Sequence, residues 1–118
     1  MHDATEGGVL QAIREIAIAS NKAIAVNLEN IQVDPVVETV ARAVNVDPFK
    51  LLSSGCLVVT ISDKNREEFE YTLRSLGKPY SFIGSVKSGR GEVYLYRGSQ
   101  LVEVINRDII DEIYKLWM

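Results

Sequence analysis

The residues best suited to chemistry lie at the start of the chain, in residues 2–8. This heptapeptide reads His-Asp-Ala-Thr-Glu-Gly-Gly, and a strongly apolar, helix-forming stretch follows it. The first turn of a helix exposes unpaired N–H groups and the positive end of the helix dipole, so it favours anions. Two glycines would let a phosphate approach that backbone closely. The pattern therefore predicts that Gly7 and Gly8 face the phosphates of a nucleotide or a phosphorylated intermediate.

The acidic residues of the heptapeptide complicate this prediction. Asp3 and Glu6 repel a phosphate unless Mg²⁺ lies between them and it, although they could instead orient His2 or polarise a substrate amide. We take His2, Asp3 and Glu6 as the candidate catalytic residues and predict no dedicated protein metal site. A structural interpretation stays open, in which Thr5 caps the helix, Glu6 interacts with its dipole and the glycines only permit close packing.

A second candidate site lies at Ser53, Ser54 and Gly55. These residues separate a short helix, begun by Asp47-Pro48, from the apolar run 56–61, which we expect to be a buried strand. Their amides and hydroxyls could form a small anion-binding nest, and we assign them to cofactor binding. A helix C-cap with glycine in a left-handed conformation explains Gly55 equally well. Cys56 is expected to be a small buried hydrophobic residue.

The remaining pattern predicts an α+β fold. Apolar spacing indicates helices over about 7–20, from Asp34-Pro35, from about 62–65 to Gly77 with Phe69, Leu73 and Leu76 inward, and from Asn106 to the end. Period-two alternation predicts a strand near 23–28, and three β-prone runs separated by turn sequences suggest a meander over 80–86, 92–97 and 101–105. We expect a mixed, largely antiparallel sheet covered by helices in three α/β/α layers.

Composition limits the classes of protein that fit. The 118 residues are 47% hydrophobic and 25% charged with a net charge of -3, which is typical of one folded domain spanning residues 1–118. Acidic and basic residues are interspersed without a basic stripe, so nucleic acid is not an expected partner. A single cysteine excludes an intramolecular disulfide. Without a long apolar span or a signal-peptide pattern, we expect no membrane association and a cytoplasmic location.

Four segments carry a family resemblance: HDATEGGV, AIAVNLENIQV, DPFKLLSSGCLVV and FIGSVKSGRGEVYL. In this order they resemble the C-terminal domain of the AIR synthase-related superfamily. That superfamily includes aminoimidazole ribonucleotide synthetase, formylglycinamidine ribonucleotide synthetase, selenophosphate synthetase, thiamine monophosphate kinase and the hydrogenase maturation factor HypE. The likeness is nearest to HypE and its relatives.

The resemblance implies that this chain is the C-terminal part of a larger, ATP-dependent enzyme. Such an enzyme has an N-terminal ATP-binding domain, absent here, that forms a dimer and holds ATP and Mg²⁺ between the domains. The shared reaction phosphorylates an amide-type oxygen; in HypE it dehydrates a thiocarboxamide to a cyano group for [NiFe]-hydrogenase maturation, with other maturation proteins as partners. The heptapeptide matches the family motif, so it is expected to face that cleft, with Thr5 among the cofactor-binding residues. A free chain end at residue 2 would fray, and we therefore expect an upstream domain to lie against this edge.

Departures from the HypE pattern leave alternatives open. HypE usually has Pro and Arg where this chain has Ala4 and Glu6, and it ends in a cysteine, whereas this chain ends Lys-Leu-Trp-Met. A HypE-like enzyme with another substrate, or one cut before its tail, is compatible with these differences. We expect the isolated chain to be inactive. The competing hypothesis is a stand-alone ligand-binding, nucleotide-binding or docking module without catalysis.

Overall fold

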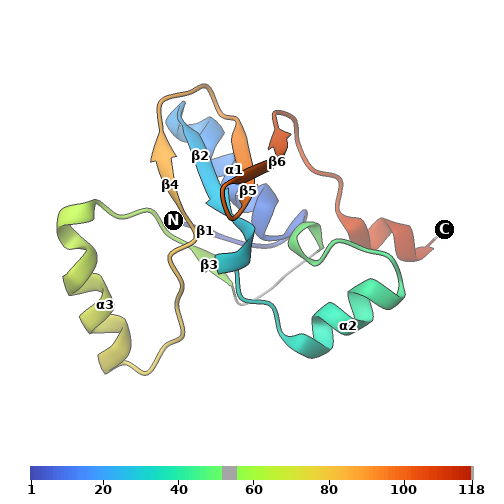
Figure 1. The fold of residues 1–118 in the computed structure, drawn as a ribbon, viewed down its shortest axis with the longest axis horizontal. Coiled ribbons are helices and arrows are strands. Elements are labelled where there is room, and N and C mark those ends of the chain that lie inside the picture. Colours follow the sequence, from blue (N-terminus) through green and yellow to red (C-terminus); the bar gives the residue numbers. More distant parts are fainter. Residues whose placement is uncertain (52–55, 118) are drawn as a thin grey trace.

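The fold is α+β, as the sequence predicts, and combines three helices with a mixed four-stranded sheet (Figure 1). The computed structural model describes residues 1–51 and 56–117. In chain order the elements are β1 (His2–Asp3), α1 (Gly8–Ser20), β2 (Ala23–Asn27), η1 (Leu28–Asn30), α2 (Pro35–Ala43), η2 (Pro48–Lys50), β3 (Leu57–Val58), η3 (Asp63–Asn65), α3 (Arg66–Ser75), β4 (Gly84–Lys87), β5 (Val93–Arg97), β6 (Gln100–Ile105) and η4 (Glu112–Trp117), where η marks 3₁₀ helices.

The sheet has the strand order β4-β2-β5-β6. β2 is antiparallel to β4 and parallel to β5, and β5 forms an antiparallel hairpin with β6. The predicted meander is therefore wrong for β4 and β5, because β2 lies between them. Gly84 makes this pairing possible, since a Cβ at that position would collide with the carbonyl oxygen of Ala25 on β2. The hairpin of β5 and β6 is confirmed.

One face of α1 packs against the sheet and forms the core. Leu10 and Ile13 are each 1% exposed and Ala17 is fully buried, and they belong to one apolar cluster with residues of β2, β5 and β6. Burying such a Leu or Ile side chain stabilises the fold by about 1.5–3 kcal/mol. α1 ends at Asn21, whose left-handed backbone lets its N–H donate to carbonyl oxygens of the last turn. The chain then enters β2 directly.

α2 and α3 lie on either side of the region below the sheet in Figure 1. α2 begins as predicted, with Asp34 accepting a 2.8 Å hydrogen bond from the Val36 amide and proline at the first helical position. α3 departs from the prediction, because it has no buried residue and Leu76 is 64% exposed. Its contact with the rest of the chain includes Arg66, whose guanidinium lies 4.0 Å from the ring centroid of Phe82.

β3 is much shorter and more exposed than the buried strand predicted over 56–61. It comprises two residues, pairs antiparallel with β1, and leaves Leu57 55% exposed. Cys56 is also exposed, so its assignment as a buried hydrophobic residue is wrong. The reason is the partner strand: β3 adds to the two residues of β1 and not to the central sheet, so little of the chain can cover it.

The C-terminal segment, residues 106–117, is not the predicted amphipathic α-helix. Residues 106–111 carry no helix, and a 3₁₀ helix, η4, follows. Polar contacts with distant parts of the chain hold this segment, among them a hydrogen bond of 2.8 Å from the Ile109 amide to Oε1 of Gln11. Ile110, expected on the apolar stripe, is 80% exposed. Within the described residues, none of the helices has the length and apolar character needed to cross a bilayer.

Candidate functional site

The heptapeptide of residues 2–8, called the polar entrance below, leads from β1 into the first turn of α1. Asp3, Thr5 and Glu6 are exposed, His2 is half-buried, and Ala4 between them is fully buried. The amide of Ala4 donates a 2.9 Å hydrogen bond to the carbonyl oxygen of Cys56, which continues the pairing of β1 with β3. This anchoring holds the polar side chains on an open surface of the domain.

His2 lies between two carboxylates. Its Nε2 contacts Oε2 of Glu15 on α1, and its Nδ1 lies 3.5 Å from Oδ1 of Asp3. The hydrogen bond to Glu15 raises the pKa of His2 above its ordinary value, partial burial opposes this, and the charges of Glu15 and Asp3 add to the increase. Both ring nitrogens can donate only in the imidazolium form, so the site favours a positive charge beside the two acids.

The two glycines differ in their surroundings. Both have positive φ, 85° at Gly7 and 75° at Gly8, which is the left-handed region that side chains disfavour. Gly8 is buried against the backbone of Phe49 and Leu51, where a Cβ would come within 2.5 Å of the Phe49 oxygen. Gly8 therefore permits close packing of two backbone segments, which is the structural interpretation left open by the sequence. Gly7 is buried beside the side chain of Gln11.

Thr5 is not the N-cap of α1. The N-cap is Gly7, which has no side chain that could accept a hydrogen bond from the first turn. The Thr5 carbonyl oxygen instead accepts a 3.0 Å hydrogen bond from the Gly8 amide, which closes the turn ahead of the helix. The Thr5 side chain takes no part in capping the helix, and Thr5 is exposed.

The amide of Gly7 is bound by a residue near the other end of the chain. It donates a buried hydrogen bond of 2.6 Å to Oδ2 of Asp111. Asp111 is 2% exposed, and its Oδ1 accepts a further hydrogen bond of 2.8 Å from the Ile113 amide. The amide that we expected to face a phosphate therefore meets a carboxylate of the same chain.

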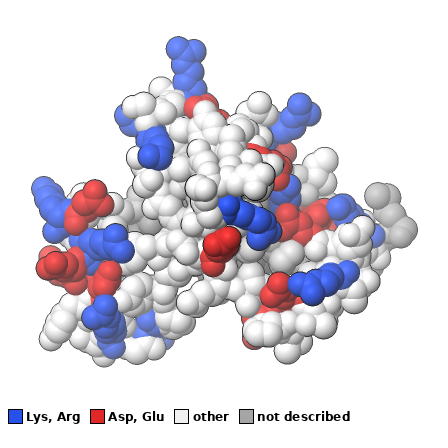
Figure 2. All heavy atoms as spheres, viewed as in Figure 1, with Lys and Arg blue, Asp and Glu red and all other residues white. Residues whose placement is uncertain are grey.

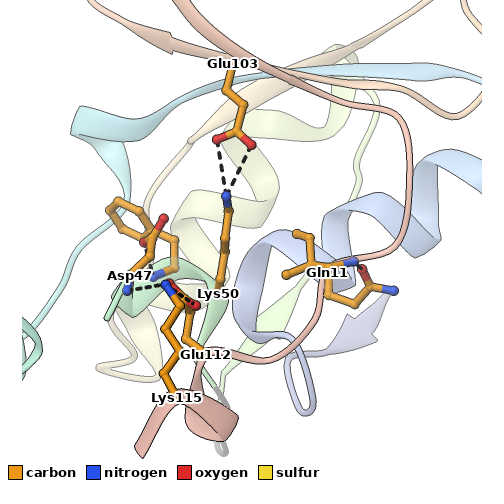
Figure 3. Close-up of polar contacts among 8 residues, drawn as sticks. Gln11, Asp47, Lys50, Glu103, Glu112 and Lys115 are labelled. Carbon is orange, nitrogen blue, oxygen red and sulfur yellow. Dashed lines mark hydrogen bonds and ion pairs between the residues drawn. The ribbon is translucent and has the colours of Figure 1, made fainter. Parts of the chain in front are cut away.

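Gln11 connects the polar entrance with the C-terminal segment, and Figure 3 shows its side chain beside that segment. Its Oε1 accepts from the Ile109 amide, while its Nε2 lies 3.3 Å from Oε1 of Glu15 and 3.4 Å from Oδ1 of Asp108. Gln11 thus contacts both the carboxylate that holds His2 and the segment that carries Asp111. It is 8% exposed, which makes it one of the few buried polar residues.

The structure brings the predicted residues of the polar entrance together and adds three that the sequence did not single out. These are Gln11, Glu15 and Asp111. Helical spacing offered a signal for Gln11 and Glu15, which lie one turn apart at the start of α1. No local pattern marked Asp111, which contacts Gly7 from 104 positions away. Ser53, Ser54 and Gly55, the second predicted site, lie outside the described residues.

The charges around the site are mixed in sign. Figure 2 shows basic and acidic side chains interspersed over the visible face. Among the described residues, no group of three or more His, Cys, Asp or Glu side chains is placed to hold a metal ion. A groove of about 710 Å³ opens between α2, η2 and the hairpin of β5 and β6, but none of residues 2–8 lines it. The exposed side chains of the polar entrance thus lie outside this groove.

The α+β fold and the motif of residues 2–8 together characterise one family of domains. Residues 1–96 match the family described as "AIR synthase related protein, C-terminal domain", so this chain is a member of that family. It is 30% identical over 93 residues to the carbamoyl dehydratase HypE of Escherichia coli, and 26% identical over 114 residues to a putative hydrogenase expression/formation protein of Methanocaldococcus jannaschii. These matches cover 77% and 94% of the chain, but only 28% and 32% of the relatives.

Solved structures of HypE share the fold. The crystal structure of E. coli HypE matches with a TM-score of 0.77 at 28% identity, over 92% of this chain and 34% of that protein. A HypE crystallised with ATP matches with a TM-score of 0.75 at 25% identity, over 89% of this chain and 35% of that one. The HypE of a HypE–HypF complex has the same fold, with a TM-score of 0.78 at 24% identity. This chain thus spans about a third of the length of the proteins it resembles.

Proposed function

We propose that this chain is the C-terminal domain of a HypE-like, ATP-dependent enzyme. An N-terminal ATP-binding domain of the same protein would complete the site and form a homodimer. The observation that carries the proposal is the open placement of Asp3, Thr5 and Glu6 beside His2, at the start of α1, in a member of this family. A surface that presents acids and a hydroxyl beside a helix start suits one half of an interdomain cleft.

The proposed reaction is transfer of the γ-phosphoryl group of ATP to an amide-type oxygen. In HypE-type chemistry this converts a thiocarboxamide to a cyano group, because the oxygen becomes a good leaving group once phosphorylated. Asp3 and Glu6 would hold Mg²⁺, whose charge neutralises the phosphates; two exposed carboxylates suit an ion that keeps waters and phosphate oxygens as its other ligands. His2, whose imidazolium form Glu15 and Asp3 favour, would bind a developing negative charge when protonated.

The partners of the complete protein follow from the same proposal. HypE has been crystallised in a complex with HypF. We infer that the complete protein meets a HypF-like partner, or other hydrogenase maturation proteins, in the cytoplasm. The second candidate function is a docking module without catalysis. It is favoured by the apolar face of α2, where Val36 is 71% and Val40 56% exposed.

Phosphate release by the protein encoded by the whole gene tests the proposal. We expect Mg²⁺-dependent hydrolysis of ATP that falls at least about tenfold in Asp3→Asn, because a carboxylate that holds the metal acts on the transition state. Asp63→Asn, an exposed carboxylate in η3, is the matched control and should keep full activity. A gene that encodes no upstream domain, or a whole protein without hydrolysis, would favour the docking module.

A further inference from the structure

The C-terminal segment of residues 106–117, called the C-terminal latch below, lies across the polar entrance. The carbonyl oxygen of Asn106 accepts a 3.0 Å hydrogen bond from Arg14, and the hydroxyl of Tyr114 lies 3.1 Å from Oε1 of Glu6. Together with the Gln11 and Asp111 contacts, these bonds join the latch to the first half of α1 and to the turn before it. The latch therefore touches the surface proposed to bind phosphate.

A second anchor joins the latch to η2. Glu112 accepts a 3.0 Å hydrogen bond from the Asp47 amide and pairs with Lys115 at 2.9 Å, as Figure 3 shows. η2 is also the segment whose backbone covers Gly8. The latch is thus held both at Gly7 and at the segment that covers Gly8.

The contact at Gly7 carries the inference. A backbone amide has one hydrogen, so a phosphate bound through the Gly7 amide would use the same donor that Asp111 occupies. The main-chain oxygen of Ile109 also lies 3.5 Å from where a Cβ of Gly7 would be, so the latch covers this residue. A carboxylate and a phosphate cannot both be accommodated there, because they are like charges competing for one donor.

We propose that the C-terminal latch is an autoinhibitory contact, in which Asp111 occupies the phosphate position at Gly7 and must leave before a phosphate group binds. This inference rests on the proposed function of the polar entrance. Release of the latch frees the amide of Gly7 and, through Tyr114, the carboxylate of Glu6. It also frees Gln11, which contacts the carboxylate beside His2. Release of the latch therefore changes the hydrogen bonds of Gly7, Glu6 and Gln11 at the same time.

The first test measures amide hydrogen exchange in the 118-residue chain by NMR. Removing the acceptor in Asp111→Ala should raise exchange at Gly7 about ten- to a hundredfold, since hydrogen bonds to charged groups contribute about 1.5–3 kcal/mol. Asp108→Ala is the matched control, because this carboxylate lies in the same segment but is 76% exposed and meets Gln11 only at 3.4 Å. Exchange at Gly7 that stays within about twofold in Asp111→Ala overturns the latch.

The second test titrates the same proteins with pyrophosphate and Mg²⁺. We expect the Gly7 signal of Asp111→Ala to respond with an affinity about tenfold above that of the unsubstituted chain, and Asp108→Ala to match the unsubstituted chain. Asp111→Leu, which keeps a similar shape but has no acceptor for the Gly7 amide, supplies the same comparison if the alanine variant does not fold. Equal responses at Gly7 with and without the Asp111 carboxylate overturn the competition.

The two proposals fail separately. If Asp111 and pyrophosphate do not compete at Gly7 but the whole protein hydrolyses ATP, the autoinhibitory latch is wrong and the proposed function stands. If Asp111 and pyrophosphate compete at Gly7 but the whole protein never hydrolyses ATP, the proposed enzyme activity is wrong. The latch would then still be a contact that a ligand displaces.

Discussion

The imidazole of His2, on β1, contacts the carboxylate of Glu15, two turns into α1. Asp3 faces the other ring nitrogen, at 3.5 Å. The arrangement joins a strand of the small β1–β3 sheet to the main helix of the domain. It places the one histidine of the chain at the edge of the polar entrance, with its pKa raised by the neighbouring carboxylates.

This arrangement predicts a raised pKa for His2 that depends on Glu15. Glu15→Gln should lower the pKa of His2 toward its ordinary value near 6.5, as measured by the pH dependence of its ring NMR signals. Because the folded pKa is the higher one, the pair stabilises the fold fully below pH 6.5 and loses this effect as the pH rises through the folded pKa. Glu67→Gln, on exposed α3, is the control. Equal pKa values in both variants would contradict the contact.

A second prediction separates backbone strain from packing at Gly8. Gly8→Ala should lower the free energy of unfolding by about 2–4 kcal/mol, because it adds a collision with the backbone of Phe49 and Leu51 to the cost of a positive φ. Gly77→Ala is the matched control, with φ of 65° and nothing within 4 Å of the added Cβ, and should cost about 1 kcal/mol. Urea unfolding measures both. Equal losses would mean that the close approach at Gly8 is absent.

A third prediction concerns the pH dependence of the Glu112 anchor. Burial opposes ionisation of Glu112, but the hydrogen bonds from Lys115 and the Asp47 amide outweigh it and lower its pKa below 4.5. The folded pKa is the depressed one, so this group stabilises the fold above pH 4.5 and loses the effect as the pH falls through the folded pKa. Glu112→Gln should therefore cost about 1 kcal/mol near neutrality and progressively less in acid.

The control for this anchor is Glu38→Gln on α2. Glu38 pairs with Arg42 at 3.3 Å, but both side chains are exposed, so its loss should cost less than about 0.5 kcal/mol at every pH. Urea unfolding at several pH values measures the two variants together. If Glu112→Gln lowers the free energy of unfolding as little as Glu38→Gln, and equally at every pH, the proposed anchor is wrong.

A fourth prediction follows from the exposure of Cys56. A disulfide reagent should modify Cys56 in the folded chain at a rate within about tenfold of that in denaturant, because no unfolding is needed to reach it. Cys56→Ala should change the free energy of unfolding by less than about 0.5 kcal/mol, as expected for a surface substitution. If Cys56 reacts several orders of magnitude more slowly in the folded chain than in denaturant, Cys56 is buried, as the sequence predicted.

Local sequence patterns predicted those elements whose formation depends on near neighbours. The apolar spacing of α1 predicted its buried face, Asp34-Pro35 predicted the start of α2, and the turn sequence between the runs 92–97 and 101–105 predicted the hairpin of β5 and β6. They succeeded because helix periodicity, capping and turn geometry act over a few residues. The family resemblance likewise depended on the order of short segments and is confirmed by the family match.

The tertiary structure decided what depends on pairing across the chain. It placed β2 between β4 and β5, paired β3 with β1, and set Asp111 against Gly7. No short pattern encodes such contacts, because the free energy that selects one strand neighbour or one buried acceptor comes from burial and hydrogen bonding between segments that meet only when the chain folds. The residue types of the heptapeptide define the chemistry available at the polar entrance. Folding determined which group of the chain occupies it.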